Sequence, residues 1–82
     1  MKIKIKVYST PSCPYCHLAK EYFKENNIDF EDFDVSKDEN ALMEMMNKSG
    51  QMGVPVIDID GEIIIGFNRA EIERIIKEKG IK

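Results

Sequence analysis

Two kinds of hydrophobic spacing alternate along the first half of the chain. Isoleucine and valine alternate with lysine over about residues 2–8, which predicts a strand followed by a loop at 9–12. Hydrophobic positions then recur at spacings of three and four over 14–26, which predicts a helix. Alternation returns over 28–35, with one slip, and predicts a second strand. The helix is expected to turn Leu18, Ala19, Tyr22 and Phe23 inward.

A second helix is predicted over roughly residues 38–48. Ser36 is expected to cap its start, because serine accepts hydrogen bonds from the free N–H groups of a first helical turn. Gly50 and Gly53 end this helix and open a loop. The predicted buried face consists of Leu42, Met45 and Met46.

The last third of the chain predicts a hairpin and a final helix. Strands over 54–59 and 62–65 flank Asp60-Gly61, a two-residue turn signal. A helix follows Gly66-Phe67-Asn68, with lysines in its last turn that suit the helix dipole. Its predicted inward positions are Ile72, Ile75 and Ile76.

These elements follow the order βαβαββα and predict one α/β domain over residues 1–82. The first two strands are joined through a helix and should be parallel, whereas the last two form an antiparallel hairpin. We therefore expect a four-stranded mixed sheet flanked by three helices. Lys2, Lys4 and Lys6 fit a covered strand poorly. Either that end of the strand projects beyond the helices, or the lysine stems lie along the sheet with their ammonium groups in water.

Composition narrows the function classes. The chain is 43% hydrophobic and 33% charged, as in ordinary globular proteins. Its longest strongly apolar run is three isoleucines, far short of the roughly 20 residues that cross a bilayer. The alternating N-terminus lacks the continuous apolar region of a signal peptide, so we expect a cytoplasmic protein. A net charge of −3, with acidic residues mixed among the basic ones, argues against nucleic acid as a partner.

The segment Cys13-Pro14-Tyr15-Cys16 carries the candidate chemistry. Proline is favoured at the first helical position, which places Cys13 at the N-cap. Its sulfur would then lie near the unpaired N–H groups of Tyr15 and Cys16, which stabilise a thiolate. Such sites lower a cysteine pKa to about 3.5–7.5, from roughly 8.5. Cys13 is therefore the predicted nucleophile.

Cys16 lies one helical turn further on and is predicted to resolve the mixed disulfide formed on Cys13. We expect it to be more buried and to have a higher pKa. A disulfide between the two closes a very small ring and should be readily reversible, as an electron carrier requires.

Three other interpretations of the two cysteines remain open. Two structural cysteines would be buried, which suits a helix start poorly. Cys-x-x-Cys followed by His17 also matches the sequence motif for covalent haem attachment. That attachment needs export and usually a second axial ligand, whereas this sequence has a single histidine and no export signal. Metal carriage on Cys13 and Cys16 is the third, but small carriers of this kind have the order βαββαβ. We predict no metal site.

Pro55 opens the third predicted strand, one of the few positions where a sheet accepts proline. Sequence alone leaves open whether the Val54-Pro55 peptide bond is cis. Gly53, directly before it, would allow another backbone to approach closely.

The chain resembles a dithiol glutaredoxin of the thioredoxin fold over essentially its whole length. The resemblance is carried by Tyr8 on the first strand, the Cys-Pro-Tyr-Cys turn, Val54-Pro55 and Gly66. The resemblance implies that Cys13 attacks, that Cys16 resolves, and that Pro55 is cis and packs beside the sulfurs. It also implies that the backbone of Val54 pairs with an extended substrate.

The same resemblance has departures at the glutathione site. Thr10 stands where glutathione-using members carry Lys or Arg, Gly53 where they carry Thr, and Arg69 where they carry Asp. Losing a charge-assisted hydrogen bond costs about 1.5–3 kcal/mol. The pattern is also similar to the glutaredoxin-like redoxins that are reduced by thioredoxin reductase and serve ribonucleotide reductase. The implied substrate or glutathione contacts are Tyr15, Gln51, Val54, Pro55, Gly66, Phe67 and Asn68.

The sequence thus predicts a thiol–disulfide oxidoreductase that reduces protein or low-molecular-weight disulfides through a mixed disulfide on Cys13, which either Cys16 or glutathione resolves. It needs no metal or organic cofactor, with glutathione as a candidate co-substrate. The expected partners are disulfide-containing proteins and either glutathione or a thioredoxin reductase. We expect a monomer that binds neither membranes nor nucleic acid.

Overall fold

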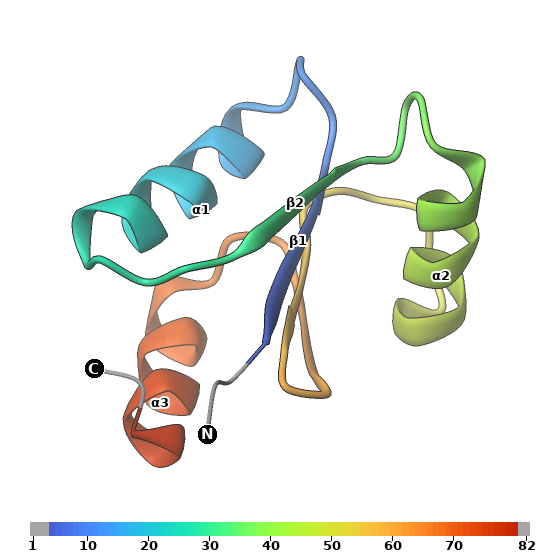
Figure 1. Cartoon of the computed structure of the whole chain (residues 1–82). Coiled ribbons are helices and arrows are strands. Elements are labelled where there is room, and N and C mark those ends of the chain that lie inside the picture. The colour runs from blue at the N-terminus through green and yellow to red at the C-terminus, as the bar shows by residue number, and fades with distance from the viewer. Residues whose placement is uncertain (1–3, 81–82) are drawn as a thin grey trace.

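The computed structural model describes residues 4–80, which form a four-stranded sheet with helices on both faces (Figure 1). Helices α1 and α3 cover one face, and α2 covers the other. The elements are β1 (Ile5–Ser9), α1 (Pro14–Glu25), β2 (Glu31–Asp34), α2 (Glu39–Ser49), β3 (Val56–Ile59), β4 (Glu62–Ile65) and α3 (Arg69–Lys79).

The strands lie in the order β2-β1-β3-β4, so β1 and β3 are internal. Strands β1 and β2 are parallel, β1 and β3 antiparallel, and β3 and β4 form an antiparallel hairpin. Asp60 and Gly61 both have positive φ at the hairpin turn, as a two-residue connection of this kind requires. The predicted element order and mixed sheet are confirmed. No helix within residues 4–80 combines the length and hydrophobicity needed to span a membrane.

Several predicted boundaries were wrong. Strand β1 includes Ser9, and its predicted first two residues lie outside the described chain. Strand β2 is shorter than predicted because the chain first turns at Asn27, where φ is +56°, and Ile28 is buried without joining the sheet. Strand β3 begins at Val56, two residues later than predicted. Alternation marked the hydrophobic positions correctly but extended the strands beyond their paired residues.

Helix α2 begins at Glu39 with Asp38 as its N-cap, so the prediction that Ser36 caps it was wrong. The Asp38 carboxylate accepts a hydrogen bond from the Ala41 N–H at 3.1 Å. Ser36 instead donates to the Asp34 carboxylate from both its N–H and its hydroxyl. Ser36 and Asp38 both have side chains able to cap a helix, and the turn that Ser36 makes with Asp34 leaves Asp38 at the N-cap.

Two hydrophobic side chains predicted to face inward are largely exposed. Met46 is 38% exposed, whereas Ala41 and Met45 form the buried face of α2. Leu18 is 46% exposed, and Cys16 occupies the buried position on that side of α1. The buried face of α1 therefore consists of Cys16, Ala19, Tyr22 and Phe23, and Leu18 lies outside it.

The sheet separates two hydrophobic clusters. The larger one lies between the sheet and helices α1 and α3, and the smaller one lies beneath α2. Burying large aliphatic and aromatic side chains stabilises each by about 1.5–3 kcal/mol. The fully buried members of the larger cluster include Val7, Ala19, Phe23, Ile57, Ile59 and Ile72, and those of the smaller include Tyr8, Met45 and Val56.

Lys6 is tolerated on an internal strand because its charge reaches a polar network beneath α2. Its ammonium lies 3.2 Å from Glu44 and 5.7 Å from the centroid of the Phe33 ring. Glu44 also accepts hydrogen bonds from Tyr8 and pairs with Lys48. Hydrogen bonds from Tyr8, Lys48 and Lys6 lower the pKa of Glu44 to about 2. The lysine stem thus lies along the sheet while its charge is paired, and the ion pairs tie α2 to β1.

Candidate active site

The site begins at the amino end of α1, where Cys13 occupies the N-cap and Pro14 the first helical position. Cys13 has extended backbone dihedral angles, and its Sγ accepts a hydrogen bond from the Cys16 N–H at 3.2 Å. The sequence predicted the N–H groups of Tyr15 and Cys16 as donors to this sulfur, and the structure identifies the Cys16 N–H. The Cys13 sulfur therefore takes the place that a side-chain oxygen usually has at a helix N-cap.

The loop before Cys13 is fixed by hydrogen bonds at both ends. The Cys13 N–H donates to the Thr10 carbonyl at 3.3 Å, and the exposed ring of His17 contacts the Pro11 carbonyl through Nε2 at 3.0 Å. The His17 N–H donates to the Cys13 carbonyl. His17 therefore braces the turn from outside.

The two sulfurs differ sharply in environment although both are free thiols. Cys16 is completely buried, whereas Cys13 is half-buried. The pKa of Cys16 is raised to about 12. Burial is the largest cause, and the hydrogen bond and charge interaction with Cys13 act in the same direction. At neutral pH Cys16 is thus protonated, and Cys13 is the sulfur that a substrate can reach.

Val54 and Pro55 form the other wall of the site. The Val54-Pro55 peptide bond is cis, as the resemblance implied. The Cys13 thiol lies 3.9 Å from the Val54 carbonyl oxygen, which brings together residues 41 positions apart in sequence. Pro55 is buried, and its carbonyl accepts a hydrogen bond from the Gly66 N–H at 2.8 Å. Gly66 therefore supports the Val54-Pro55 wall through its backbone.

The remaining predicted binding side chains already have contacts within the fold. Gln51 closes a small ring with Gly53: its amide nitrogen donates to the Gly53 carbonyl at 2.9 Å, and its oxygen accepts from the Gly53 N–H at 2.6 Å. Asn68 caps α3, and Phe67 packs against the larger hydrophobic cluster. Tyr15, by contrast, is 62% exposed beside Cys13. The geometry thus gathers Cys13, Cys16, Val54 and Pro55.

A polar cluster that sequence analysis missed lies next to Cys16. The Lys20 ammonium contacts Ser9 and Asp32, and its charge lowers the pKa of Cys16 against the larger effects of burial. The only sequence signal for this cluster is the four-residue spacing between Cys16 and Lys20, which places both on one face of a helix.

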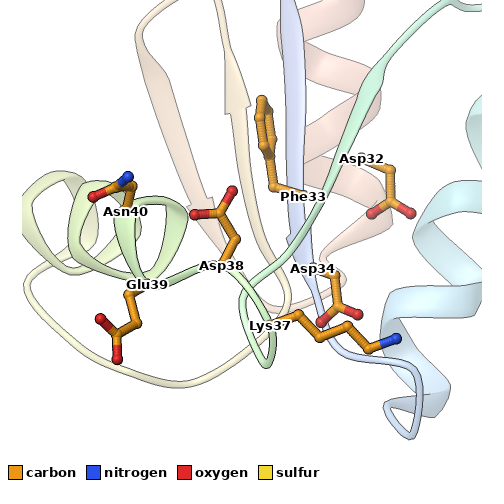
Figure 2. Close-up of a pocket in the computed structure, with 7 residues that line it drawn as sticks. All are labelled: Asp32, Phe33, Asp34, Lys37, Asp38, Glu39 and Asn40. Atoms are coloured by element: carbon orange, nitrogen blue, oxygen red, sulfur yellow. The ribbon is translucent and has the colours of Figure 1, made fainter.

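An acidic hollow beside β2 is separate from these sulfurs. It has a volume of about 710 Å³ and is open to solvent (Figure 2). Figure 2 shows Asp32 directed towards α1, on the side of β2 opposite Phe33. Within residues 4–80, no group of three or more His, Cys, Asp or Glu side chains is arranged to hold a metal ion. The hollow is lined by Asp32, Phe33, Asp34, Lys37, Asp38, Glu39 and Asn40.

Known proteins share both the sequence and the fold. The glutaredoxin family model matches residues 5–64. A glutaredoxin-like 8.6 kDa protein in the rubredoxin operon of Clostridium pasteurianum is 55% identical, over 90% of this chain and 99% of that protein. Glutaredoxin 3 of Escherichia coli strain K12 is 32% identical, over 76% of this chain and 75% of its own length.

A solved structure extends the likeness to three dimensions. The crystal structure of the thioredoxin-like protein BC3987 superposes with a TM-score of 0.83 and 38% identity, covering 88% of this chain and 99% of that one. The predicted thioredoxin-like fold is therefore confirmed.

Proposed function

The chain belongs to the glutaredoxin family, and from that premise we propose that it reduces protein or low-molecular-weight disulfides through a mixed disulfide on Cys13. Thiol–disulfide oxidoreduction in general follows from the family. The observation that supports the finer proposal is the pairing of a reachable sulfur at a helix N-cap with a buried thiol one turn away. We also propose the cytoplasm as the compartment, because a secreted disulfide scaffold of this length would usually carry more than two cysteines.

The first step is attack of the Cys13 thiolate on one sulfur of the substrate disulfide. The new bond joins Cys13 to that sulfur, the substrate S–S bond breaks, and the departing sulfur takes its electron pair and a proton from water. We propose that the backbone of Val54 pairs with the substrate chain on either side of the reacting sulfur. The 3.9 Å separation between Cys13 Sγ and the Val54 carbonyl supports this arrangement.

In the second step Cys16 loses its proton and attacks the sulfur of Cys13. The bond between Cys13 and the substrate breaks, the second substrate sulfur leaves as a thiol, and Cys13 and Cys16 become a disulfide. The substrate has then gained two electrons and the protein has lost two. Because the mixed disulfide has no charge on Cys13, one of the causes that raises the pKa of Cys16 disappears at this point.

Two reductants fit this chemistry, and the side-chain contacts favour a thioredoxin reductase over glutathione. Arg69 stands where an acidic residue would bind the glutathione amine, and its guanidinium pairs with Glu73 at 2.8 Å and lies 5.5 Å from the Tyr22 ring. The Gln51 amide is occupied by Gly53. Glutathione would therefore have to displace existing contacts and approach a cation.

Turnover of a small disulfide, coupled to NADPH through either reductant, tests this choice. We expect thioredoxin reductase to support turnover more efficiently than glutathione with glutathione reductase. Replacing Arg69 by Asp should raise the glutathione-dependent kcat/KM by about tenfold, because a charge-assisted hydrogen bond replaces a repulsion. Arg69→Ala, which only removes the repulsion, is the matched control and should lie between them. Faster glutathione-dependent turnover by the unmodified protein would overturn the preference for a reductase.

A further inference from the structure

Three polar side chains meet on the inner side of α1, one turn beyond Cys16. The Lys20 ammonium lies 3.1 Å from the Asp32 carboxylate and 3.4 Å from the Ser9 hydroxyl. Ser9 also donates to the other Asp32 oxygen at 2.7 Å. The direction of Asp32 towards α1 is visible in Figure 2. The three side chains therefore hold one another, and the ammonium is fixed between a helix and two strands.

This arrangement keeps a positive charge near the buried sulfur. Residues four apart on a helix have Cβ atoms about 5–6 Å apart, so Cys16 and Lys20 are neighbours on one face. Ser9 is only 2% exposed, and the Lys20 side chain is 17% exposed. Two oxygen atoms hold the Lys20 ammonium: the hydroxyl of buried Ser9, and the carboxylate of Asp32, whose side chain is 44% exposed. Charge acts more strongly on a group that is out of water than on one that is solvated.

We propose that Lys20 is a positioning residue for the second step, stabilising the thiolate of Cys16 as it attacks the mixed disulfide. Ser9 and Asp32 hold the ammonium in place. This inference rests on the proposed two-step function. The proton of Cys16 passes to water. The new Cys16–Cys13 bond and the departing substrate sulfur balance as described above.

The charges around Cys16 explain why Lys20 acts mainly in that step. The titratable groups that act on this sulfur are Cys13 at the N-cap and Lys20 on α1. On β2, Asp32 pairs with Lys20, and Asp34 interacts with the Lys20 charge. In the reduced protein, charge on Cys13 opposes ionisation of Cys16. In the mixed disulfide that charge is gone, while the charge on Lys20 remains. Removing Lys20 should therefore raise the pKa of Cys16 in the mixed disulfide and slow resolution at neutral pH.

A single-turnover reaction with a chromogenic aromatic disulfide separates the two steps, because each step releases one coloured thiol. Lys20→Met removes both the charge and the hydrogen bonds, Lys20→Gln keeps a hydrogen-bonding group without charge, and Lys20→Arg keeps the charge. Lys24→Met, one turn further along α1, is the matched control. Stopped-flow traces across a range of pH give both rates for each variant, and thermal unfolding confirms that each folds.

We expect both neutral variants to slow the second release about three- to tenfold at neutral pH, with the rates converging at high pH as Cys16 ionises fully. The first release should change less than twofold, and Lys20→Arg and Lys24→Met should match the unmodified protein. Equal slowing of both releases, or no change in the second, would overturn the role of Lys20. If Lys20→Met fails to fold, the rate of the second release by Lys20→Gln tests the role of Lys20 instead. If the unmodified protein shows no second release at all, the proposed two-step function itself fails.

Discussion

Replacing Cys13 by Ser is expected to abolish disulfide reduction, lowering the rate by on the order of a thousandfold or more. A serine hydroxyl is not ionised at neutral pH, so the attacking thiolate is lost. Cys16 cannot substitute for it, because it is completely buried and burial is the main cause that raises its pKa to about 12. The rate of thiol release from a chromogenic disulfide, measured with excess protein, checks this prediction.

The Cys13→Ser protein should remain folded, which makes the test clean. Serine is among the favoured N-cap residues, so its oxygen can accept the hydrogen bond that the Cys13 sulfur now accepts from the Cys16 N–H. Circular dichroism and thermal unfolding provide the control. A folded variant that keeps a tenth or more of the original rate would show that another group is the nucleophile.

Replacing Cys16 by Ser should have the opposite signature, a mixed disulfide that accumulates. Cys13 still attacks and releases one equivalent of substrate thiol, but no second thiol is present to release the other. Intact mass spectrometry should therefore detect the protein with one covalently attached substrate half. Turnover dependent on a protein reductant should fall at least about a hundredfold, since the internal disulfide cannot form.

Burial of the new hydroxyl needs a control of its own, because Cys16 has no exposed surface. Cys16→Ala removes the sulfur without adding a polar group to the core and should give the same adduct and the same single equivalent. Release of two equivalents by either variant would contradict the role assigned to Cys16. So would the absence of an adduct from both.

Local signals in the sequence predicted the position of Cys13 because they act over a few residues. Pro14 fixes where α1 begins, which in turn fixes Cys13 at the N-cap. The hairpin at Asp60 and Gly61 was predictable for the same reason, since that dipeptide accepts positive φ at both positions. Features that depend only on the backbone conformation of one turn could therefore be predicted without knowledge of the tertiary structure.

Features that depend on packing were harder to predict. Two candidate caps precede α2, and only the turn made by Asp34 selects Asp38 over Ser36. Met46 satisfies the hydrophobic spacing of α2, yet the orientation of the helix on the sheet leaves it largely exposed. A lysine at position 6 argues against a strand covered on both faces, and only the tertiary structure shows that Glu44 pairs with its charge.

The walls of the site are also set by tertiary structure. The distance between Cys13 and Val54 depends on how β3 lies beside β1, because 41 positions separate them in sequence. Lys20 and Asp32 carry no motif and are brought together only by the placement of α1 over β2. The position of Cys13 and Cys16 at the start of α1 could therefore be predicted from sequence, whereas the charge of Lys20 beside Cys16 could not.

The proposed mechanism depends on a difference between the two sulfurs: Cys13 can be reached by a substrate, whereas Cys16 is buried and protonated. Alkylation of the reduced protein with limiting iodoacetamide at neutral pH, followed by peptide mass spectrometry, measures this division directly. We predict that Cys13 is modified while Cys16 stays unmodified, because Cys16 is inaccessible and its pKa is raised to about 12. Equal modification of the two cysteines, or preferential modification of Cys16, would contradict the account.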